Sequence, residues 1–351
     1  MLTQAKMAAI GIVGNIALDY YLLNYNDTQR VKEKLATWGI ELEAGKKITD
    51  DKVNGLLAKL EQATMRKLGG GGYNSLKAFL EISRNNDFLY YDISQKPPKI
   101  ERLREDKRVT YNFRNLSYIC QGLIIRKGND RTIIKTPRYD RGINVKREDL
   151  ESLANGLTNS DVIFVNSIGN YYVADTIGRN FSDKPKYVVV TKTLIENELK
   201  PSKLLVNSLS IIDVDEIDIL GYPITKTNGS SIFENENNKR SIKNAIEKLL
   251  KLGAKKAIVT LGQEGVVYSE NGSIKRVSTK REKEAEIQDS MATYNILKNG
   301  TGDYFASGLV FYLENMPDFE EAITNAQIFV IKNMLKYQDI TERDFETTII
   351  R

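Results

Sequence analysis

The sequence predicts an α/β domain in which helices flank a central, mostly parallel β-sheet. In the second half of the chain, four short apolar runs are typical of buried strands: Val162–Val165, Tyr187–Val190, Ser210–Ile212 and Ala257–Thr260. Helical patterns lie between such runs, and the clearest covers 241–252, where apolar residues recur every three or four positions. Alternating strands and helices are typical of a parallel sheet with covered faces. We therefore expect one domain over residues 1–351.

An apolar run near the N-terminus predicts the first strand. Residues 8–14 fit a buried strand that ends at Gly14-Asn15. The apolar stretch Met7–Leu18 is too short to span a bilayer, which takes about 20 residues. Asn15 interrupts it, and no small-residue cleavage site follows, so it does not fit a signal peptide. We expect a cytoplasmic protein with no membrane association.

Two segments predict a small β lid, one at about 20–68 and the other at about 108–145. The first contains an amphipathic stretch after Thr49, in which Val53–Leu60 presents one apolar helical face. In the second, residues 117–126 and 131–135 fit a strand pair around a Gly-Asn-Asp turn. A helical pattern from Asn74 to about Ile82 lies between the two segments.

The composition excludes several kinds of active site. The chain has no histidine, which excludes a Ser-His-Asp triad, a Cys-His pair and any histidine-based metal site. Cys120 is the only cysteine, so no disulfide can form within the chain, which fits a reducing compartment. The net charge of +5 is a small excess and predicts no nucleic-acid-binding face. Catalysis must therefore rest on carboxylates, amines, hydroxyls or backbone groups.

A glycine-rich motif before a helical pattern is the strongest candidate catalytic site. Its sequence is Asn299-Gly300-Thr301-Gly302-Asp303. Glycines at a helix start let backbone N–H groups approach an anion, and the helix N-terminus adds partial positive charge. An ionised aspartate there can accept a proton from an attacking hydroxyl. The alternative is an aspartate that only caps the helix, and this motif alone does not decide between the two.

Three further motifs precede the glycine-rich motif in the sequence, and their order along the chain is informative. They are Gly14-Asn15-Ile16-Ala17-Leu18-Asp19, Gly69-Gly70-Gly71-Gly72-Tyr73-Asn74 and Thr260-Leu261-Gly262-Gln263-Glu264-Gly265. Together the four motifs resemble those of the PfkB/ribokinase family of carbohydrate and nucleoside kinases, from Gly14 to about Asn333. The resemblance implies a ribokinase-like fold with a small β lid. It also implies ATP-dependent phosphorylation of a hydroxyl on a sugar, a sugar derivative or a nucleoside.

The resemblance implies a role for each motif residue. The acceptor hydroxyls bind Asp19, and the same pocket is lined by Gly69, Gly70 and Asn74. The nucleotide lies against Thr260, Gly262 and Gly265. The anion hole consists of Gly300, Thr301 and Gly302, with Asp303 as the catalytic base.

The implied cofactors are ATP and Mg²⁺, and Glu216 matches the family residue that helps position Mg²⁺ through water. The implied partner is a small-molecule acceptor, with no nucleic acid. Lid edges in this family often pair between subunits, so a homodimer through the lid is a further expectation.

The chain departs from the family pattern at several positions. Asp213 takes the place of an asparagine in the metal motif, Leu297-Lys298 replaces Asp-Thr, and Thr301 replaces an alanine. The interval from Asp19 to Gly69 is about twice the one the family leads us to expect. These departures keep open a catalytically weak, ligand-binding regulatory relative of the same fold. A nucleic-acid-associated protein is a second alternative, favoured only by the pI of about 8.9.

Each of the other motifs also has a purely structural interpretation. Asp19 can cap a strand end, Gly69–Gly72 can be a flexible link, and Thr260–Gly265 can be a simple β-turn. Glu216 can be a solvated helix residue. The absence of a Gly-x-x-x-x-Gly-Lys-Ser/Thr sequence excludes a P-loop nucleotide site.

The second lid segment is strongly basic. From Arg108 to Arg141 the chain has eight basic and two acidic residues. Arginine suits phosphate because its planar fork donates two parallel hydrogen bonds. We hypothesise an anionic acceptor, such as a sugar phosphate or sugar acid, that binds Arg131 and Arg138. The alternative is a solvated edge, where basic residues discourage strand pairing between molecules.

Overall fold

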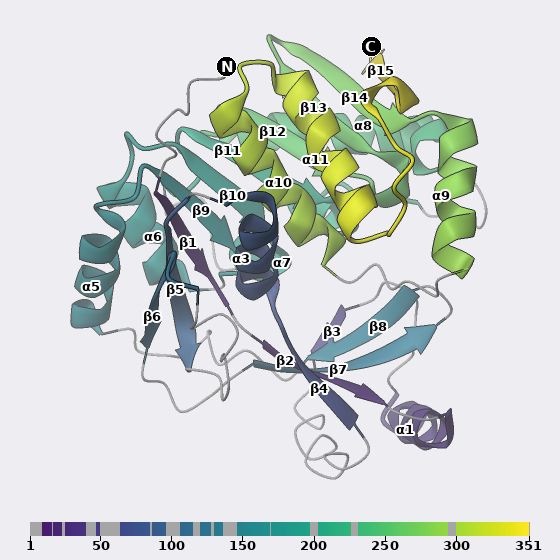
Figure 1. Ribbon diagram of the computed structural model, residues 1–351, viewed down its shortest axis with the longest axis horizontal. Coiled ribbons are helices and arrows are strands. Elements are labelled where there is room, and N and C mark those ends of the chain that lie inside the picture. The colour runs from purple at the N-terminus through teal and green to yellow at the C-terminus, as the bar shows by residue number, and fades with distance from the viewer. Residues whose placement is uncertain are drawn as a thin grey trace.

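The computed structural model contains two β-sheets and the helices that cover the larger one (Figure 1). It describes residues 9–15, 17–22, 25–39, 47–49, 64–84, 86–95, 106–114, 120–127, 130–135, 146–168, 170–196, 203–225, 231–293 and 300–350. The predicted α/β architecture with a central, mostly parallel sheet is confirmed.

The large sheet has ten strands. They are β1 (Ile10–Gly14), β5 (Phe88–Gln95), β6 (Val109–Arg114), β9 (Val162–Asn166), β10 (Lys186–Val190), β11 (Ser208–Asp213), β12 (Lys256–Thr260), β13 (Val266–Glu270), β14 (Ser273–Thr279) and β15 (Phe345–Ile350). Their order is β15-β14-β13-β12-β11-β10-β9-β1-β5-β6. The seven strands from β12 to β6 are parallel, and β13, β14 and β15 extend the sheet antiparallel. Each of the four apolar runs predicted in the second half is one of these strands.

Helices cover both faces of the large sheet (Figure 1). One face packs against α3 (Gly71–Ile82), α10 (Thr301–Asn315) and α11 (Phe319–Asn333), and the other against α5 (Arg147–Leu157), α6 (Tyr171–Asn180) and α8 (Glu236–Lys251). Neighbouring strand residues alternate between the two cores, so that Phe164 packs with α3 and Val165 packs on the opposite face. The other α-helices in the described part of the chain are α1 (Tyr25–Thr37), α7 (Lys192–Glu196) and α9 (Arg281–Thr293). Within the described ranges, none of the helices is long and apolar enough to cross a membrane.

The small sheet has five strands in the order β3-β8-β7-β2-β4. They are β2 (Ala17–Leu22), β3 (Lys47–Thr49), β4 (Thr64–Gly69), β7 (Cys120–Lys127) and β8 (Asp130–Lys135). β7 and β8 form the antiparallel pair predicted from the sequence. β6 belongs to the large sheet, so the second lid segment contributes to the small sheet only from Cys120 onward. The amphipathic stretch Val53–Leu60 lies outside the described residues.

The chain passes directly between the two sheets at Gly14. Only two residues separate the end of β1 from the start of β2. At this crossing the backbone of α3 approaches β1 closely, because a Cβ atom on Gly72 would lie 2.6 Å from the Gly14 carbonyl carbon and 2.7 Å from the Asn15 nitrogen. The run Gly69–Gly72 therefore allows a close contact between the backbones of α3 and β1, and it is not a flexible link.

We expect Gly72→Ala to lower the free energy of unfolding by about 1–3 kcal/mol, because β1 or α3 must shift to admit the methyl group. Gly302→Ala is the matched control, since it is also helical and its Cβ would meet no atom within 4 Å. Urea denaturation measures both changes. Equal stabilities of the two variants would contradict the close contact.

Candidate active site

The predicted motifs gather at one edge of the large sheet, where its parallel strands end. In the strand register Gly14 pairs with Asn166, and Asp213 pairs with Thr260. These four residues end β1, β9, β11 and β12. Ligands of open parallel sheets bind beyond this carboxyl edge. The sheet therefore brings motifs from both halves of the chain to a single site.

The N-terminus of α10 meets this edge at the predicted anion hole. Gly300 precedes the helix with a φ of 86°, in the left-handed region that favours glycine, and no side chain caps the helix there. A Cβ on Gly300 would lie 3.2 Å from the Asn74 amide nitrogen, whereas one on Gly302 would meet none of the described residues within 4 Å. The first N–H groups of a helix have no acceptor within the helix. Open space beside them suits a bound anion.

The Asp303 carboxylate is held on both of its oxygens. Asn74 Nδ2 donates to Oδ2 at 2.9 Å, and Asn166 Nδ2 donates to Oδ1 at 2.9 Å. The two donors come from α3 and from the end of β9. Three elements therefore fix the orientation of one carboxylate in the first turn of α10.

Asn166 is the site residue that the sequence analysis missed. The residue is 1% exposed, and its Nδ2 also lies 2.9 Å from Ser75 Oγ and 3.1 Å from the Gly71 carbonyl oxygen. The Ser167 hydroxyl donates to its Oδ1 at 3.1 Å. The available signal was the polar residue that ends the apolar run Val162–Val165 at the carboxyl edge.

A buried tyrosine attaches α10 to α3 beside the carboxylate. The Tyr304 hydroxyl donates to Glu81 Oε1 at 2.9 Å, and its ring stacks on Phe329 with 5.8 Å between centroids. Burial, together with the charge of Glu81, raises the pKa of Tyr304 above its usual value. The hydroxyl therefore stays protonated at neutral pH and keeps its role as a donor, which stabilises the position of Asp303.

The predicted acceptor residues are distributed over both sheets. Gly69 ends β4 and pairs with Ala17, and Gly70 precedes α3 with a φ of 92°. Asn74 lies in α3, and its amide contacts Asp303, a contact that the sequence analysis did not predict. Asp19 lies in β2, paired with Lys67 and Gly122, and Arg131 lies in β8 opposite Arg126. The side chains of Asp19 and Arg131 lie outside the described parts of the structure, as does all of Arg138.

The predicted nucleotide turn is tightly fixed. The Leu261 N–H donates to the Gly265 carbonyl at 2.8 Å, and Gly262 and Gly265 have φ values of 64° and 89°. A Cβ on Gly265 would lie 2.1 Å from the Val277 carbonyl oxygen, whereas one on Gly262 would meet nothing within 4 Å. The backbone at Gly262 is therefore accessible to a ligand at the carboxyl end of β12.

The acidic residues of the predicted metal motif contact neighbouring strands and turns. Thr260 Oγ1 donates to Asp213 Oδ2 at 3.2 Å, and the Lys192 N–H donates to Glu216 Oε2 at 2.9 Å. Across the described residues, no group of three or more acidic or cysteine side chains is arranged to hold a metal ion. Mg²⁺ in kinases usually keeps several waters and binds substrate phosphates with one or two carboxylates. Glu216 acting through water fits that pattern.

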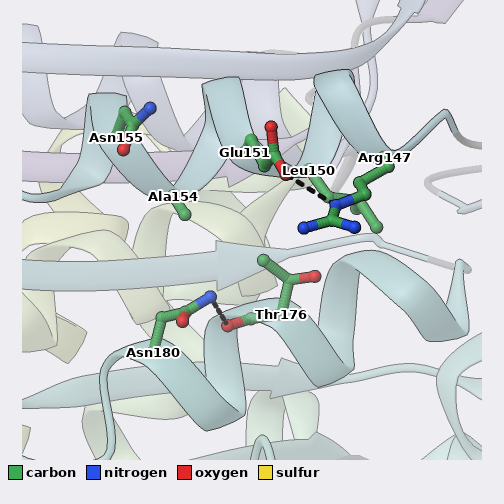
Figure 2. A pocket seen from close by; sticks show the side chains of 7 residues that line it. All are labelled: Arg147, Leu150, Glu151, Ala154, Asn155, Thr176 and Asn180. Atoms are coloured by element: carbon green, nitrogen blue, oxygen red, sulfur yellow. Dashed lines mark hydrogen bonds and ion pairs between the residues drawn. The ribbon is translucent and has the colours of Figure 1, made fainter.

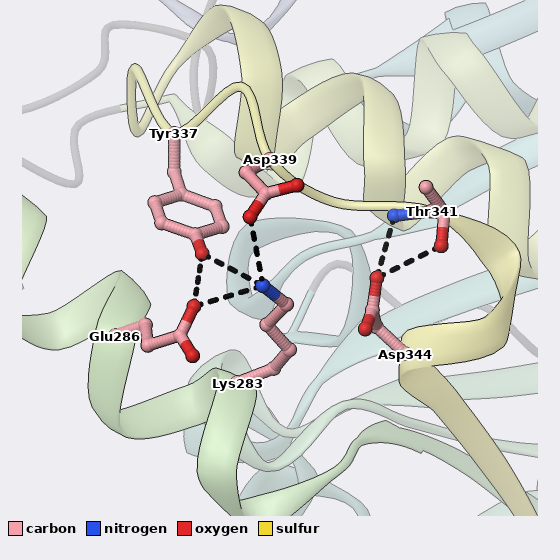
Figure 3. A network of polar contacts seen from close by, with 6 residues as sticks. All are labelled: Lys283, Glu286, Tyr337, Asp339, Thr341 and Asp344. Atoms are coloured by element: carbon pink, nitrogen blue, oxygen red, sulfur yellow. Dashed lines mark hydrogen bonds and ion pairs between the residues drawn. The ribbon is translucent and has the colours of Figure 1, made fainter.

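A polar network fixes α9, the helix that precedes the predicted anion hole. Lys283 Nζ lies 2.8 Å from Glu286 Oε2, 3.0 Å from Tyr337 Oη and 3.2 Å from Asp339 Oδ2 (Figure 3). Hydrogen bonds to Lys283 and Tyr337 lower the pKa of Glu286. The network attaches α9 to the segment that follows α11. Residues 294–299, between α9 and Gly300, lie outside the described residues and include Leu297-Lys298.

A separate pocket lies between α5 and α6 (Figure 2). Its lining residues are Arg147, Leu150, Glu151, Ala154, Asn155, Thr176 and Asn180. These helices cover the face opposite α3 and α10. The pocket therefore contains none of the predicted site residues that the structure describes.

Comparison with solved structures identifies the fold. Adenosine kinase from Schistosoma mansoni in complex with 2-fluoroadenosine has a TM-score of 0.66 at 13% identity, covering 97% of this chain and 99% of that chain. Adenosine kinase from Anopheles gambiae in complex with P1,P4-di(adenosine-5) tetraphosphate has a TM-score of 0.66 at 14% identity, and the match covers 95% of this chain and 99% of that chain. A protein described as a probable sugar kinase from Rhizobium etli has a TM-score of 0.62 at 12% identity, covering 94% of each chain.

No family model and no curated protein matches the sequence. At such low identities the structural likeness shows the fold alone, and it extends over nearly the whole chain. The chain has the ribokinase-like fold of PfkB-type sugar and adenosine kinases.

Proposed function

We propose that this protein is an ATP-dependent kinase that phosphorylates a hydroxyl group of a sugar, a sugar derivative or a nucleoside. The observation that carries the proposal is the Asp303 carboxylate, held on both oxygens in the first turn of α10. Beside it, a Cβ atom on Gly302 would meet none of the described residues within 4 Å. A carboxylate that can act as a base therefore lies beside a helix start that can bind an anion, at the carboxyl edge where ligands of open parallel sheets bind.

Phosphoryl transfer depends mostly on positioning and on stabilisation of charge. In the proposed mechanism Asp303 accepts the proton of the acceptor hydroxyl as the hydroxyl oxygen attacks the γ-phosphorus of ATP, and the bond from that phosphorus to the β–γ bridging oxygen breaks, so that ADP leaves. The N–H groups of Gly300–Gly302 stabilise the negative charge on the transferred phosphoryl group. Glu216 would hold Mg²⁺ through the water shell of the ion, and the bound ion would supply charge neutralisation at the phosphates. The small sheet covers the acceptor and excludes water, which limits hydrolysis of ATP.

A ligand-binding regulatory protein of the same fold is the alternative. The observation that favours it is Asp213, whose carboxylate accepts hydrogen bonds from Thr260 Oγ1 and from the Asp215 N–H at 2.9 Å. Both of its oxygens therefore have protein partners. Such a protein would bind its ligand without phosphorylating it, whereas a kinase would both bind and phosphorylate its acceptor.

A thermal-shift screen with sugars, sugar phosphates, sugar acids and nucleosides tests the binding part of the proposal. Each compound is measured with and without a non-hydrolysable ATP analogue. A ligand present at 100 times its Kd stabilises the protein by about 2.7 kcal/mol, so a true acceptor raises the melting temperature clearly. Failure of the ATP analogue and of every acceptor class to shift the melting temperature would count against both the kinase and the regulatory alternative.

The basic second lid segment predicts a preference for an anionic acceptor. Strand register places Arg131 directly opposite Arg126 across β7 and β8. Two arginines at directly opposite register positions suit a bound phosphate or carboxylate, because each guanidinium group can donate two parallel hydrogen bonds to such a group. This arrangement supports the hypothesis that the segment binds phosphate or carboxylate.

We expect Arg131→Met to raise the KM of an anionic acceptor by about tenfold or more, since a hydrogen bond to a charged group contributes about 1.5–3 kcal/mol. The KM for ATP and for a neutral analogue of the acceptor should stay unchanged. Steady-state kinetics with matched phosphorylated and unphosphorylated acceptors measures the effect. Preference for the neutral acceptor, together with an unaltered KM in the variant, would show that the hypothesis is wrong.

A further inference from the structure

We propose that Asn166 is a positioning residue that keeps Asp303 ionised and directs it toward the acceptor. The inference rests on the proposed function, because it assigns to Asp303 the role of base. It extends that function to a residue at the end of β9, which lies 137 positions from Asp303 in the sequence. Asn166 does not touch the reacting atoms in this account and acts only through the carboxylate.

The chemistry of the contact selects the ionised form of Asp303. An ionised carboxylate only accepts hydrogen bonds, and the Asn166 amide nitrogen only donates them. The 2.9 Å contact to Oδ1 therefore favours the charged carboxylate, as does the Asn74 contact to Oδ2. A proton on Oδ1 would face the amide N–H. The proton from the acceptor is thus held less firmly, which suits a base that must release it after each turnover.

The surroundings of Asn166 fix which end of its amide faces Asp303. Ser167 has a φ of 58°, in the left-handed region that is rare for residues other than glycine. Its hydroxyl donates to Asn166 Oδ1 at 3.1 Å, and the Gly71 carbonyl lies 3.1 Å from Nδ2. The Gly71 carbonyl can only accept, so its contact places the amide nitrogen on the side of Asp303, and the Ser167 hydroxyl can then donate to the amide oxygen. Strained backbone that persists at such a position is a feature of functional sites.

Burial makes this arrangement effective. Asn166 is 1% exposed, so little water competes for its amide. The nitrogen has two hydrogens and three neighbouring acceptors: Asp303 Oδ1, Ser75 Oγ and the Gly71 carbonyl. The ionised carboxylate is the strongest of these acceptors, because charge-assisted hydrogen bonds are about twice as strong as neutral ones. Asn166 therefore couples the end of β9 and the start of α3 to the charge state of the base.

Carbon-13 NMR of labelled aspartate side chains tests the inference without requiring activity. The Asp303 signal is assigned by its loss in Asp303→Asn. In Asn166→Ala we expect the midpoint of the Asp303 titration to move to higher pH by about one unit, because one hydrogen bond to the carboxylate is lost. In Asn166→Asp we expect a larger upward shift, since a second carboxylate replaces the donor with little change of volume.

Asn170→Ala is the matched control. Asn170 is also buried and comes four positions after Asn166, but its side chain accepts from the Tyr172 and Val173 N–H groups at the start of α6. This variant should lower the melting temperature without moving the Asp303 titration, because it removes only a helix cap. Once an acceptor is identified, kcat/KM can be measured as a function of pH. The acid limb of this pH profile should shift in the two Asn166 variants and not in Asn170→Ala.

The possible results distinguish the positioning role of Asn166 from the proposed kinase function. An unmoved Asp303 midpoint in both Asn166 variants overturns the inference, whatever the activity of the protein. A shifted midpoint in a protein that phosphorylates no acceptor supports the inference about charge and rejects the kinase function. If Asn166→Ala does not fold, the nearly isosteric Asn166→Asp alone decides the outcome.

Discussion

Replacement of Asp303 by asparagine is expected to lower the rate of phosphoryl transfer by about 10²–10⁴-fold, which is the usual contribution of a general base. The side-chain amide keeps the shape of the carboxylate but cannot accept a proton. Asn74 and Asn166 both donate to this position, so the variant retains an acceptor for only one of them. We expect a folded protein that still binds the ATP analogue. Steady-state kinetics and the thermal shift measure these two properties.

Asp318→Asn is the matched control for Asp303→Asn. Asp318 also lies at a helix start, where its side chain accepts from the Glu321 N–H at 2.7 Å and caps α11. Asparagine caps helices about as well as aspartate, so neither stability nor activity should change. If Asp303→Asn keeps more than about a tenth of the wild-type rate, Asp303 is not the base.

The second large effect concerns the acceptor. Asp19→Ala is expected to lower kcat/KM for the acceptor by about 10–150-fold, which corresponds to the 1.5–3 kcal/mol of a hydrogen bond to a charged group. A carboxylate in β2 can accept bonds from two neighbouring hydroxyls of a sugar or ribose. Because the predicted nucleotide turn follows β12 in the large sheet, the KM for ATP should change little. The reverse pattern, a raised KM for ATP with an unchanged acceptor KM, would place Asp19 at the wrong end of the site.

The large sheet was predictable because each buried strand is visible in the sequence as a short run of consecutive apolar residues. Continuous apolar runs such as Val162–Val165 are typical of strands that are buried on both faces. The helix α9 was not predicted, since its buried apolar contacts come mainly from Ile287 and Met291 among many charged residues. β6 was assigned to the lid segment because strand periodicity does not reveal which sheet a strand joins. Only its pairing with β5 places it in the large sheet.

The glycine motifs were predictable for a similar reason. The left-handed backbone at Gly70, Gly265 and Gly300 requires glycine, so the structural need is visible in the sequence itself. The contacts that hold Asp303 have no such local signal. Asn74 and Asn166 lie 229 and 137 positions from it, and an asparagine at a strand or helix end has many other uses. Asp303 could be proposed as the base from its motif, whereas the residues that contact its carboxylate could be found only from the fold.

Direct detection of the product tests the central claim most directly. The protein is incubated with ATP, Mg²⁺ and the panel of sugars, sugar phosphates, sugar acids and nucleosides, and mass spectrometry follows the mass of each acceptor. If the protein is a kinase with Asp303 as its base, at least one acceptor gains a phosphoryl group on a hydroxyl. The rate of this reaction falls in Asp303→Asn and does not fall in Asp318→Asn. Acceptor binding in the thermal-shift screen without any phosphorylated product, or a product formed equally well by Asp303→Asn, would contradict this prediction.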